Sequence, residues 1–257
     1  MAQLSAADTE ALIAYSTRIG DDALILSHRL AEMCAHAPEL EEDIALTNIA
    51  LDLIGQTRVL YSYAAELENK GRDEDKIAFL REERDYRNLL LLEQPNEDFA
   101  HVIARQFLFS AMSLPFFEAL ASSTDDTLRG VAEKAVKEVR YHLSHAAQWV
   151  IRLGDGTAES HARMQAAIDA LWMYTGEMFV MDDIDRRLLA LGIGVDLDSL
   201  RPAFNDAVGN VLDDATLTRP ADGWMASGGR SGRHTEYMGF ILTELQYMQR
   251  TYPDMTW

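Results

Sequence analysis

The chain has 257 residues, 48% of them hydrophobic, and its 42 acidic against 23 basic side chains give a net charge of −19. That balance excludes nucleic acid and anionic membrane surfaces as main partners, because both require a positively charged protein face, and it makes phosphate-rich ligands poor primary targets. One cysteine, Cys34, permits neither an intrachain disulfide nor a cysteine-based metal motif, and together with a polar start that lacks a signal-peptide pattern it favours a cytoplasmic protein.

Helical spacing of apolar residues dominates the chain, and we expect eight helices. They cover about residues 7–35, 39–68, 73–92, 97–121, 125–153, 159–191, 198–217 and 234–252. Thr124 is the expected cap of the fifth helix, and residues 218–233 are expected to form a loop. Long helices joined by short loops predict an all-α protein: one domain over residues 1–257, built as an up-down four-helix bundle with additional C-terminal helices.

Bundles of this kind often hold a di-iron centre, which is usually built from a Glu-x-x-His motif on two helices and one Glu from each of two others. No glutamate of this chain precedes a histidine by three residues. The residues at that position are Ile25, Met33, Asp98, Val139, His142, Ala158 and Ser231. The sequence therefore predicts the bundle without its usual metal cage, which suits a protein that holds a partner better than one that performs redox chemistry.

The second helix is apolar over nearly its whole circumference, so we expect it in the middle of the protein. Its polar side chains include Asn48, Asp52 and Gln56, which are spaced four apart and therefore form one stripe. Such a stripe inside a protein must find hydrogen-bond partners, because each unpaired buried polar group costs a few kcal/mol.

Hairpin geometry suggests those partners, because residues at equal distances from a turn lie level with each other. Turns centred near residues 37 and 124 place His28 beside the stripe, and they place Gln106 level with His142. The resulting candidates for a degenerate metal seam are His28, Asn48, Asp52, Gln106, Glu138 and His142. Two irons require several carboxylate oxygens, which amides cannot replace, so we expect no metal here but a hydrogen-bonded network with water.

Two sequence patterns each allow more than one interpretation. Glu138 and His142, four residues apart, are either a metal-ligand pair with altered spacing or an ordinary pair on one helix face. The glycine-rich stretch 228–233 lacks the preceding strand and the Gly-Lys-Ser/Thr ending of a phosphate-binding loop. We expect a flexible loop or one ordered by a partner, with Trp224 and Met225 as candidate interface anchors.

Several long motifs resemble the C-subunit family of bacterial phenylacetyl-CoA 1,2-epoxidases. They are His36-Ala-Pro-Glu-Leu-Glu-Glu-Asp-Ile-Ala-Leu, Asn48-Ile-Ala-Leu-Asp-Leu-Ile-Gly-Gln56, Leu89-Leu-Leu-Leu-Glu-Gln-Pro-Asn96, Ile103-Ala-Arg-Gln106, Lys137-Glu-Val-Arg-Tyr-His142, the stretch from Gly228 to His234-Thr-Glu, and Glu244-Leu-Gln-Tyr-Met-Gln-Arg250. The resemblance covers nearly the whole chain. His145 and the extra N-terminal residues depart from the family's pattern. These departures affect surface detail only.

The resemblance implies a ferritin-like fold and a non-catalytic, structural role in a multicomponent oxygenase of aerobic phenylacetate catabolism. In that family the di-iron site lies in a related A subunit, which binds the CoA thioester and forms a heterodimer with the C subunit that doubles into a larger assembly. A reductase with FAD, an iron–sulfur centre and NADPH supplies electrons, and O2 supplies the epoxide oxygen. The C subunit itself would hold no cofactor, and alone it would expose an apolar patch.

Two other functions remain open from the residues alone. One is a stand-alone ferritin-like di-iron oxidase or oxygenase with a degenerate metal site. The other is a helical adaptor outside oxygen chemistry. Metal content and co-purifying partners separate them.

Overall fold

The computed structural model describes residues 4–253 and 255, and it confirms an all-α protein, since no strand occurs among those residues. The ends of the expected domain, residues 1–3, 254 and 256–257, lie outside the described part. The helices are α1 (Ala6–Ala31), α2 (Leu40–Glu68), α3 (Glu74–Phe79), α4 (Phe99–Leu120), α5 (Asp126–Gly154), α6 (Ala158–Trp172), α7 (Asp183–Ala190), α8 (Arg201–Asp214) and α9 (Glu236–Thr251). Short 3-10 turns are η1 (Glu83–Asp85), η2 (Leu90–Glu93), η3 (Gly176–Phe179), η4 (Asp198–Leu200) and η5 (Gly229–Ser231).

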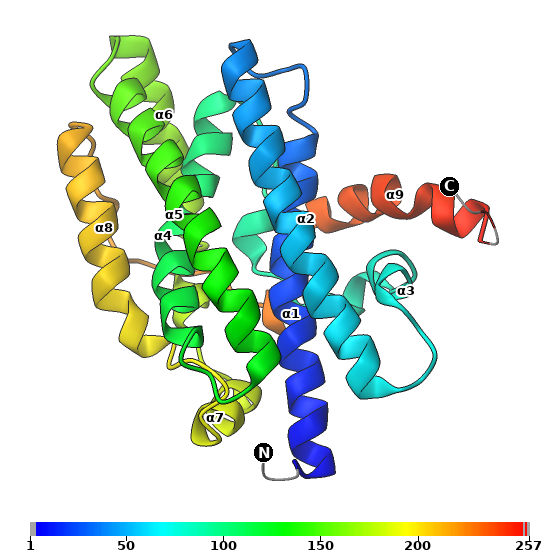
Figure 1. The fold of residues 1–257 in the computed structure, drawn as a ribbon. Helices are drawn as coiled ribbons and strands as arrows, with labels where there is room; N and C mark the ends of the chain where they lie inside the picture. The colour runs from blue at the N-terminus through cyan, green and yellow to red at the C-terminus, as the bar shows by residue number, and fades with distance from the viewer. Residues whose placement is uncertain (1–3, 254, 256–257) are drawn as a thin grey trace.

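The central four helices form two antiparallel hairpins, α1 with α2 and α4 with α5 (Figure 1). Residues 69–98 cross the length of the bundle between them, so α4 runs in the same direction as α2 and the order is up, down, down, up. One long crossover is the topology of ferritin-like bundles, which confirms that part of the expected fold class. Because of it, α2 and α5 lie antiparallel where the two hairpins meet.

Acidic and hydroxyl side chains begin most of the long helices. Ser5 forms a capping box with Asp8 at the start of α1, where the Ser5 side chain accepts from the Asp8 backbone. The expected Thr124 cap of α5 is wrong: the Asp125 carboxylate accepts from the Leu128 backbone N–H at 2.9 Å, while Thr124 Oγ1 donates to the Leu191 carbonyl. A carboxylate interacts better than a hydroxyl with the positive end of the helix dipole.

The helix expected over residues 73–92 is wrong beyond Phe79, because buried carboxylates of α1 take the backbone donors. Asp21 Oδ2 accepts from the Arg87 N–H at 2.7 Å, and Asp22 Oδ1 accepts from the Leu89 N–H at 2.8 Å. Hydrogen bonds to another element here replace the bonds that a helix would make to itself. The crossover is therefore irregular but satisfied.

The helix expected over residues 159–191 is likewise interrupted, between Trp172 and Asp183. Thr175 Oγ1 donates to the Trp172 carbonyl at 2.8 Å, which competes with continuation of the helix. The chain then turns through η3, and Asp182 caps α7 by accepting from the Asp185 N–H.

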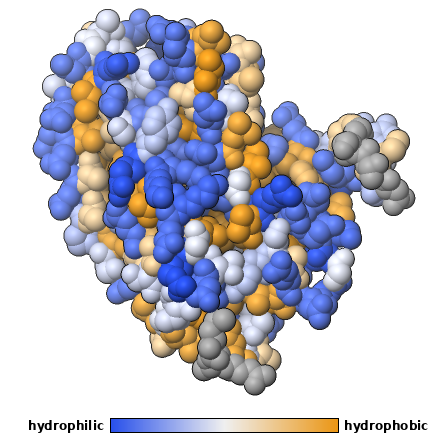
Figure 2. Space-filling view, viewed as in Figure 1, coloured by the Kyte–Doolittle hydropathy of each residue, from blue (hydrophilic) through white to orange (hydrophobic). Residues whose placement is uncertain are grey.

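The expectation that α2 lies in the middle of the protein is wrong. Its inner side packs on α1, but Leu40, Ile44, Leu51 and Ile54 are 71%, 53%, 60% and 45% exposed. These four residues are spaced along one helical face and are named here the α2 row. Helix α2 lies on the near side in Figure 1, and hydrophobic atoms are visible over it in Figure 2. The interior position belongs to α4, which buries side chains around most of its circumference.

The glycine-rich stretch is held by its own chain, so the expectation of a flexible or partner-ordered loop is wrong. The Gly228 N–H donates to Glu177 Oε1 at 2.7 Å, and Arg230 donates to both oxygens of Asp22 at 3.0 and 2.6 Å. A side-chain carbon at Gly229 would collide with the Asn88 carbonyl oxygen, so only glycine permits this close approach.

Among the described residues, none of the helices combines the length and apolar character needed to cross a bilayer.

Candidate functional site between α2 and α5

Polar side chains of α2 and α5 meet across the junction of the two hairpins. Gln56 Nε2 donates to Glu138 Oε2 at 3.0 Å, and His142 Nε2 lies 3.1 Å from Asp52 Oδ2. The antiparallel course of the helices produces these pairs, because Asp52 precedes Gln56 on α2 while His142 follows Glu138 on α5. The contacts join α2 of one hairpin to α5 of the other, whereas counting from the turns pairs residues within each hairpin.

Glu138 is engaged on both carboxylate oxygens. In addition to Gln56, Lys134 Nζ lies 3.2 Å from Glu138 Oε1, one turn earlier on the same helix. An ammonium group beside the carboxylate neutralises the charge that a cation would need there.

His142 is 1% exposed, and its ring faces a carboxylate that is 38% exposed at the side chain. Burial lowers the pKa of His142, against the raising effects of the hydrogen bond and charge of Asp52. The imidazole is therefore held neutral near pH 7, as an uncharged hydrogen-bond partner.

A second cluster on the same seam escaped the sequence reasoning. Glu42 Oε2 accepts from Trp149 Nε1 at 2.7 Å and lies 2.7 Å from His145 Nε2. Glu42 already has a local explanation as an acid in the first turn of a helix, and the sequence predicts only a surface role for His145. The i,i+4 spacing of His145 and Trp149 on α5 was the available signal.

Of the six candidates, the structure brings Asp52, Glu138 and His142 together and separates the other three. Asn48 is exposed on α2. Gln106 donates to Ser110 Oγ at 2.8 Å on its own helix, α4, and its Oε1 has no partner. His28 is associated with α9: burial lowers its pKa, and the nearby charge of Glu244 opposes that shift.

These donors do not fit a di-iron cage. Within residues 4–253 and 255, no three His, Cys, Asp or Glu side chains are grouped so that they could hold a metal ion. The seam offers three carboxylates from two helices: Glu138 is already paired with Lys134, and Glu42 with Trp149 and His145. Two bridged irons need more anionic oxygen than this.

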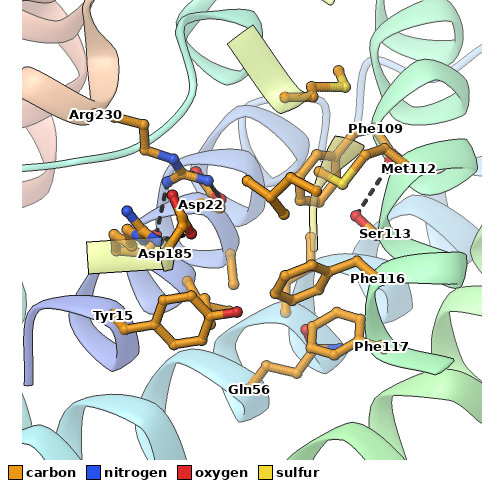
Figure 3. Close-up of a pocket in the computed structure, with 16 residues that line it drawn as sticks. Tyr15, Asp22, Gln56, Phe109, Met112, Ser113, Phe116, Phe117, Asp185 and Arg230 are labelled. Atoms are coloured by element: carbon orange, nitrogen blue, oxygen red, sulfur yellow. Dashed lines mark hydrogen bonds and ion pairs between the residues drawn. The ribbon is translucent and has the colours of Figure 1, made fainter. Parts of the chain in front are cut away.

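The bundle interior next to the seam contains a cavity of about 40 Å³ between α1, α2 and α4. Gln56 belongs to both features. Aromatic side chains of α4, Phe109, Phe116 and Phe117, form its apolar side, and Tyr15 lies opposite (Figure 3). Since a water molecule needs roughly 10–15 Å³ by this measure, the cavity has room for a few waters and not for an aromatic ring.

Two buried ion pairs, those of Arg18 and Arg230, line this cavity, and a third, that of Arg81, lies elsewhere on α1; sequence reasoning did not find them. Arg81 binds both oxygens of Asp21 at 2.5 and 3.1 Å, and Arg230 binds Asp22. Arg18 pairs with Asp185 of α7. The adjacent acids at positions 21 and 22, in the apolar part of the first helix, were the signal that could have revealed two of the three pairs.

The pKa values of two histidines, His142 and His234, are shifted in opposite directions. Burial alone would lower the pKa of His234, but the hydrogen bond and charge of Glu93, whose Oε1 lies 2.5 Å from Nδ1, raise it above its ordinary value. The pKa of His142 is lowered instead. We expect histidine Cε1–H NMR titrations with one midpoint below and one above about 6.5, assigned with His142→Gln and His234→Gln.

The direction in which each histidine changes stability with pH follows from the shift of its pKa on folding. The unfolded chain protonates His142 more readily than the folded one, so this residue reduces stability as pH falls below about 6.5. His234 contributes stability that is fully present below that pH and is lost as pH rises through its folded pKa. Midpoints in the reverse order would contradict the hydrogen-bond assignments of both residues.

Comparison with known proteins gives concordant results. The family model described as phenylacetic acid catabolic protein matches residues 1–257. The C subunit of 1,2-phenylacetyl-CoA epoxidase from Escherichia coli (strain K12) is 49% identical over 246 residues, which cover 96% of this chain and 99% of that protein. The chain, with its ferritin-like bundle and its carboxylate-poor seam, belongs to the phenylacetic acid catabolic protein family.

Proposed function

We propose that this chain is the non-catalytic structural subunit of a cytoplasmic multicomponent oxygenase that epoxidises the aromatic ring of phenylacetyl-CoA. It holds and stabilises a related catalytic A subunit, in a heterodimer that doubles into a larger assembly. The di-iron centre belongs to that partner, and a reductase with FAD, an iron–sulfur centre and NADPH supplies the electrons for O2 activation. The similarity to the C subunit of the Escherichia coli epoxidase over almost its full length supports the pathway.

The observation that carries the structural role is the α2 row. Four large aliphatic side chains remain 45–71% exposed along one face of a 29-residue helix, in a chain whose surface is otherwise strongly acidic. Burying the exposed part of each side chain contributes roughly 1 kcal/mol. A straight apolar ridge matches a long helix of another bundle, because ridges of side chains pack into grooves between them.

The seam supports the non-catalytic half of the proposal. Where a di-iron bundle would hold its metal, the seam has Gln56 hydrogen-bonded to Glu138. A neutral His142 is hydrogen-bonded to Asp52 beside them. In each pair, one side chain serves as the hydrogen-bond partner of the other, so no cation is needed. Such a seam stabilises the junction of the hairpins instead of binding iron.

Metal analysis and co-purification test the proposal together. We expect the chain produced alone in iron-rich medium to contain far less than one iron per chain. Co-expressed with the catalytic A subunit from the same organism, it should co-purify with that subunit in equal amounts. Turnover of phenylacetyl-CoA by the remaining components should fall at least tenfold when this chain is omitted.

Two other results would contradict this proposal. Two irons per chain, lost in a Glu138→Gln/His142→Gln variant, would establish the stand-alone di-iron oxidase instead. Turnover that is indifferent to the chain would place it outside the oxygenase, as an adaptor.

A further inference from the structure

A cleft on the opposite flank of the bundle from α9 has the features of a small-molecule site. It lies between the end of α6, η3, the first turn of α8 and the segment 219–227, and α8 marks its place in Figure 1. Its volume is about 340 Å³, which falls in the range of ligand sites in proteins. The cleft is remote from the seam and shares no residue with the α2 row.

Two arginines lie over aromatic rings in this cleft. The Arg201 guanidinium carbon is 4.4 Å from the centre of the Phe179 ring, and that of Arg219 is 5.0 Å from the Trp172 ring. Stacking of this kind holds the planar group in place and leaves the N–H groups along its edge free to bind an anion.

Of the two guanidinium groups in the cleft, one has no ion-pair partner. Asp222 is 3.3 Å from Arg219 and accepts from Trp172 Nε1 at 3.0 Å, while Glu177 accepts from the Leu90 and Gly228 backbones. Arg201 is exposed, and its guanidinium makes no hydrogen bond or ion pair with any described residue. In a chain with a net charge of −19, an unpaired arginine in a concave site favours a single negative charge.

Apolar contact surface and rigidity complete the site. Val180, 59% exposed, and Met225 line the cleft beside the arginines. The Ala226 N–H donates to the Met173 carbonyl at 2.8 Å, and a side-chain carbon at Gly176 would lie 2.7 Å from Met225. The wall is thus fixed before a ligand arrives, which reduces the entropy lost on binding.

We propose that this cleft binds a small monoanion with a planar apolar group, of the arylalkyl carboxylate class, with Arg201 as the residue that binds the carboxylate. The guanidinium fork matches the two carboxylate oxygens. The ring of the ligand rests against Val180 and Met225. Binding there requires neither the catalytic partner nor the assembly, so the site is independent of the structural role.

The test uses the intact chain with phenylacetate as the probe, and the indole N–H NMR signal of Trp172 as the readout, assigned with Trp172→Phe. Because Trp172 Nε1 is bonded to Asp222 in the cleft wall, ligand binding shifts this signal. We expect saturation with a dissociation constant of roughly 0.1–1 mM for a ligand of this size. Arg201→Met should weaken binding about tenfold or more, and Arg201→Lys should retain part of the affinity.

Matched controls separate recognition from non-specific effects. Arg152 stacks on Trp149 at 5.2 Å outside the cleft, so Arg152→Met should leave the affinity unchanged. Phenylacetamide, which lacks the charge, and acetate, which lacks the ring, should each bind at least tenfold more weakly. Equal affinity for phenylacetamide, equal affinity of Arg201→Met, or no shift of the Trp172 signal at 10-fold the expected dissociation constant would each overturn the proposal.

Discussion

Leu51→Glu is expected to abolish capture of the catalytic subunit while leaving the fold of this chain intact. Leu51 is 60% exposed at the middle of the α2 row, so a charge there is solvated in the free chain and costs little stability. In a complex the same carboxylate would be buried without a partner, a penalty of several kcal/mol. We expect at least a hundredfold loss of affinity in a pull-down titration with the co-expressed partner.

A matched variant tests whether position matters. Leu191→Glu introduces the same charge at another apolar residue, 40% exposed near the end of α7, and should leave capture unchanged. Unfolding midpoints of both variants should stay close to that of the native chain. If Leu51→Glu binds the partner normally, the α2 row is not the contact surface; if Leu191→Glu also fails to bind, the effect of charge is not specific to that row.

Arg230→Met is expected to lower the free energy of unfolding by about 3 kcal/mol, the lower end of the cost of breaking a buried ion pair, since Arg230 is partly exposed. The change removes two hydrogen bonds to Asp22 and one to the Arg87 carbonyl at 2.6 Å, and leaves Asp22 buried without its counter-charge. Urea unfolding followed by circular dichroism measures the loss. Trypsin should also cleave the loosened segment, at Arg219 or Arg233, faster than in the native chain.

The control is an arginine whose ion pair is exposed. Arg186 lies 3.7 Å from Asp183 with both side chains largely in solvent, so Arg186→Met should change stability by less than about 0.5 kcal/mol. Adding Asp22→Asn to Arg230→Met should recover part of the loss, because the amide oxygen can still accept from Leu89 without a buried charge. Equal stability of Arg230→Met and the native chain would show that the pair contributes nothing.

Helix periodicity and capping residues were sufficient to predict the fold class, because the four long helices of the bundle satisfy their own backbone hydrogen bonds. The interruptions after Phe79 and Trp172 could not be predicted in this way. After Phe79 the backbone donors are taken by Asp21, Asp22 and Glu177, and after Trp172 the Met173 carbonyl accepts from the Ala226 N–H; these partners lie far away in sequence. Local propensity holds no information about such partners.

The position of α2 was misjudged for a different reason. An all-round apolar helix has the same pattern whether its outer face is covered by its own chain or left exposed, as the α2 row is. Four-residue spacing on one helix did group Asp52 with Gln56 and Glu138 with His142, but counting from the turns relates residues within a hairpin and did not predict that α2 and α5 meet. It missed Glu42 and the two α5 residues that bind it, since an acid at a helix start already has a local explanation.

The buried acids of α1 also constrain how the chain is made. Asp22 receives one donor from residue 89 and two from residue 230, so its desolvation is compensated only after residue 230 has left the ribosome. Until then the first hairpin contains an uncompensated acid in its core. That hairpin therefore stays incompletely consolidated during synthesis, and its completion depends on the segment around residue 230.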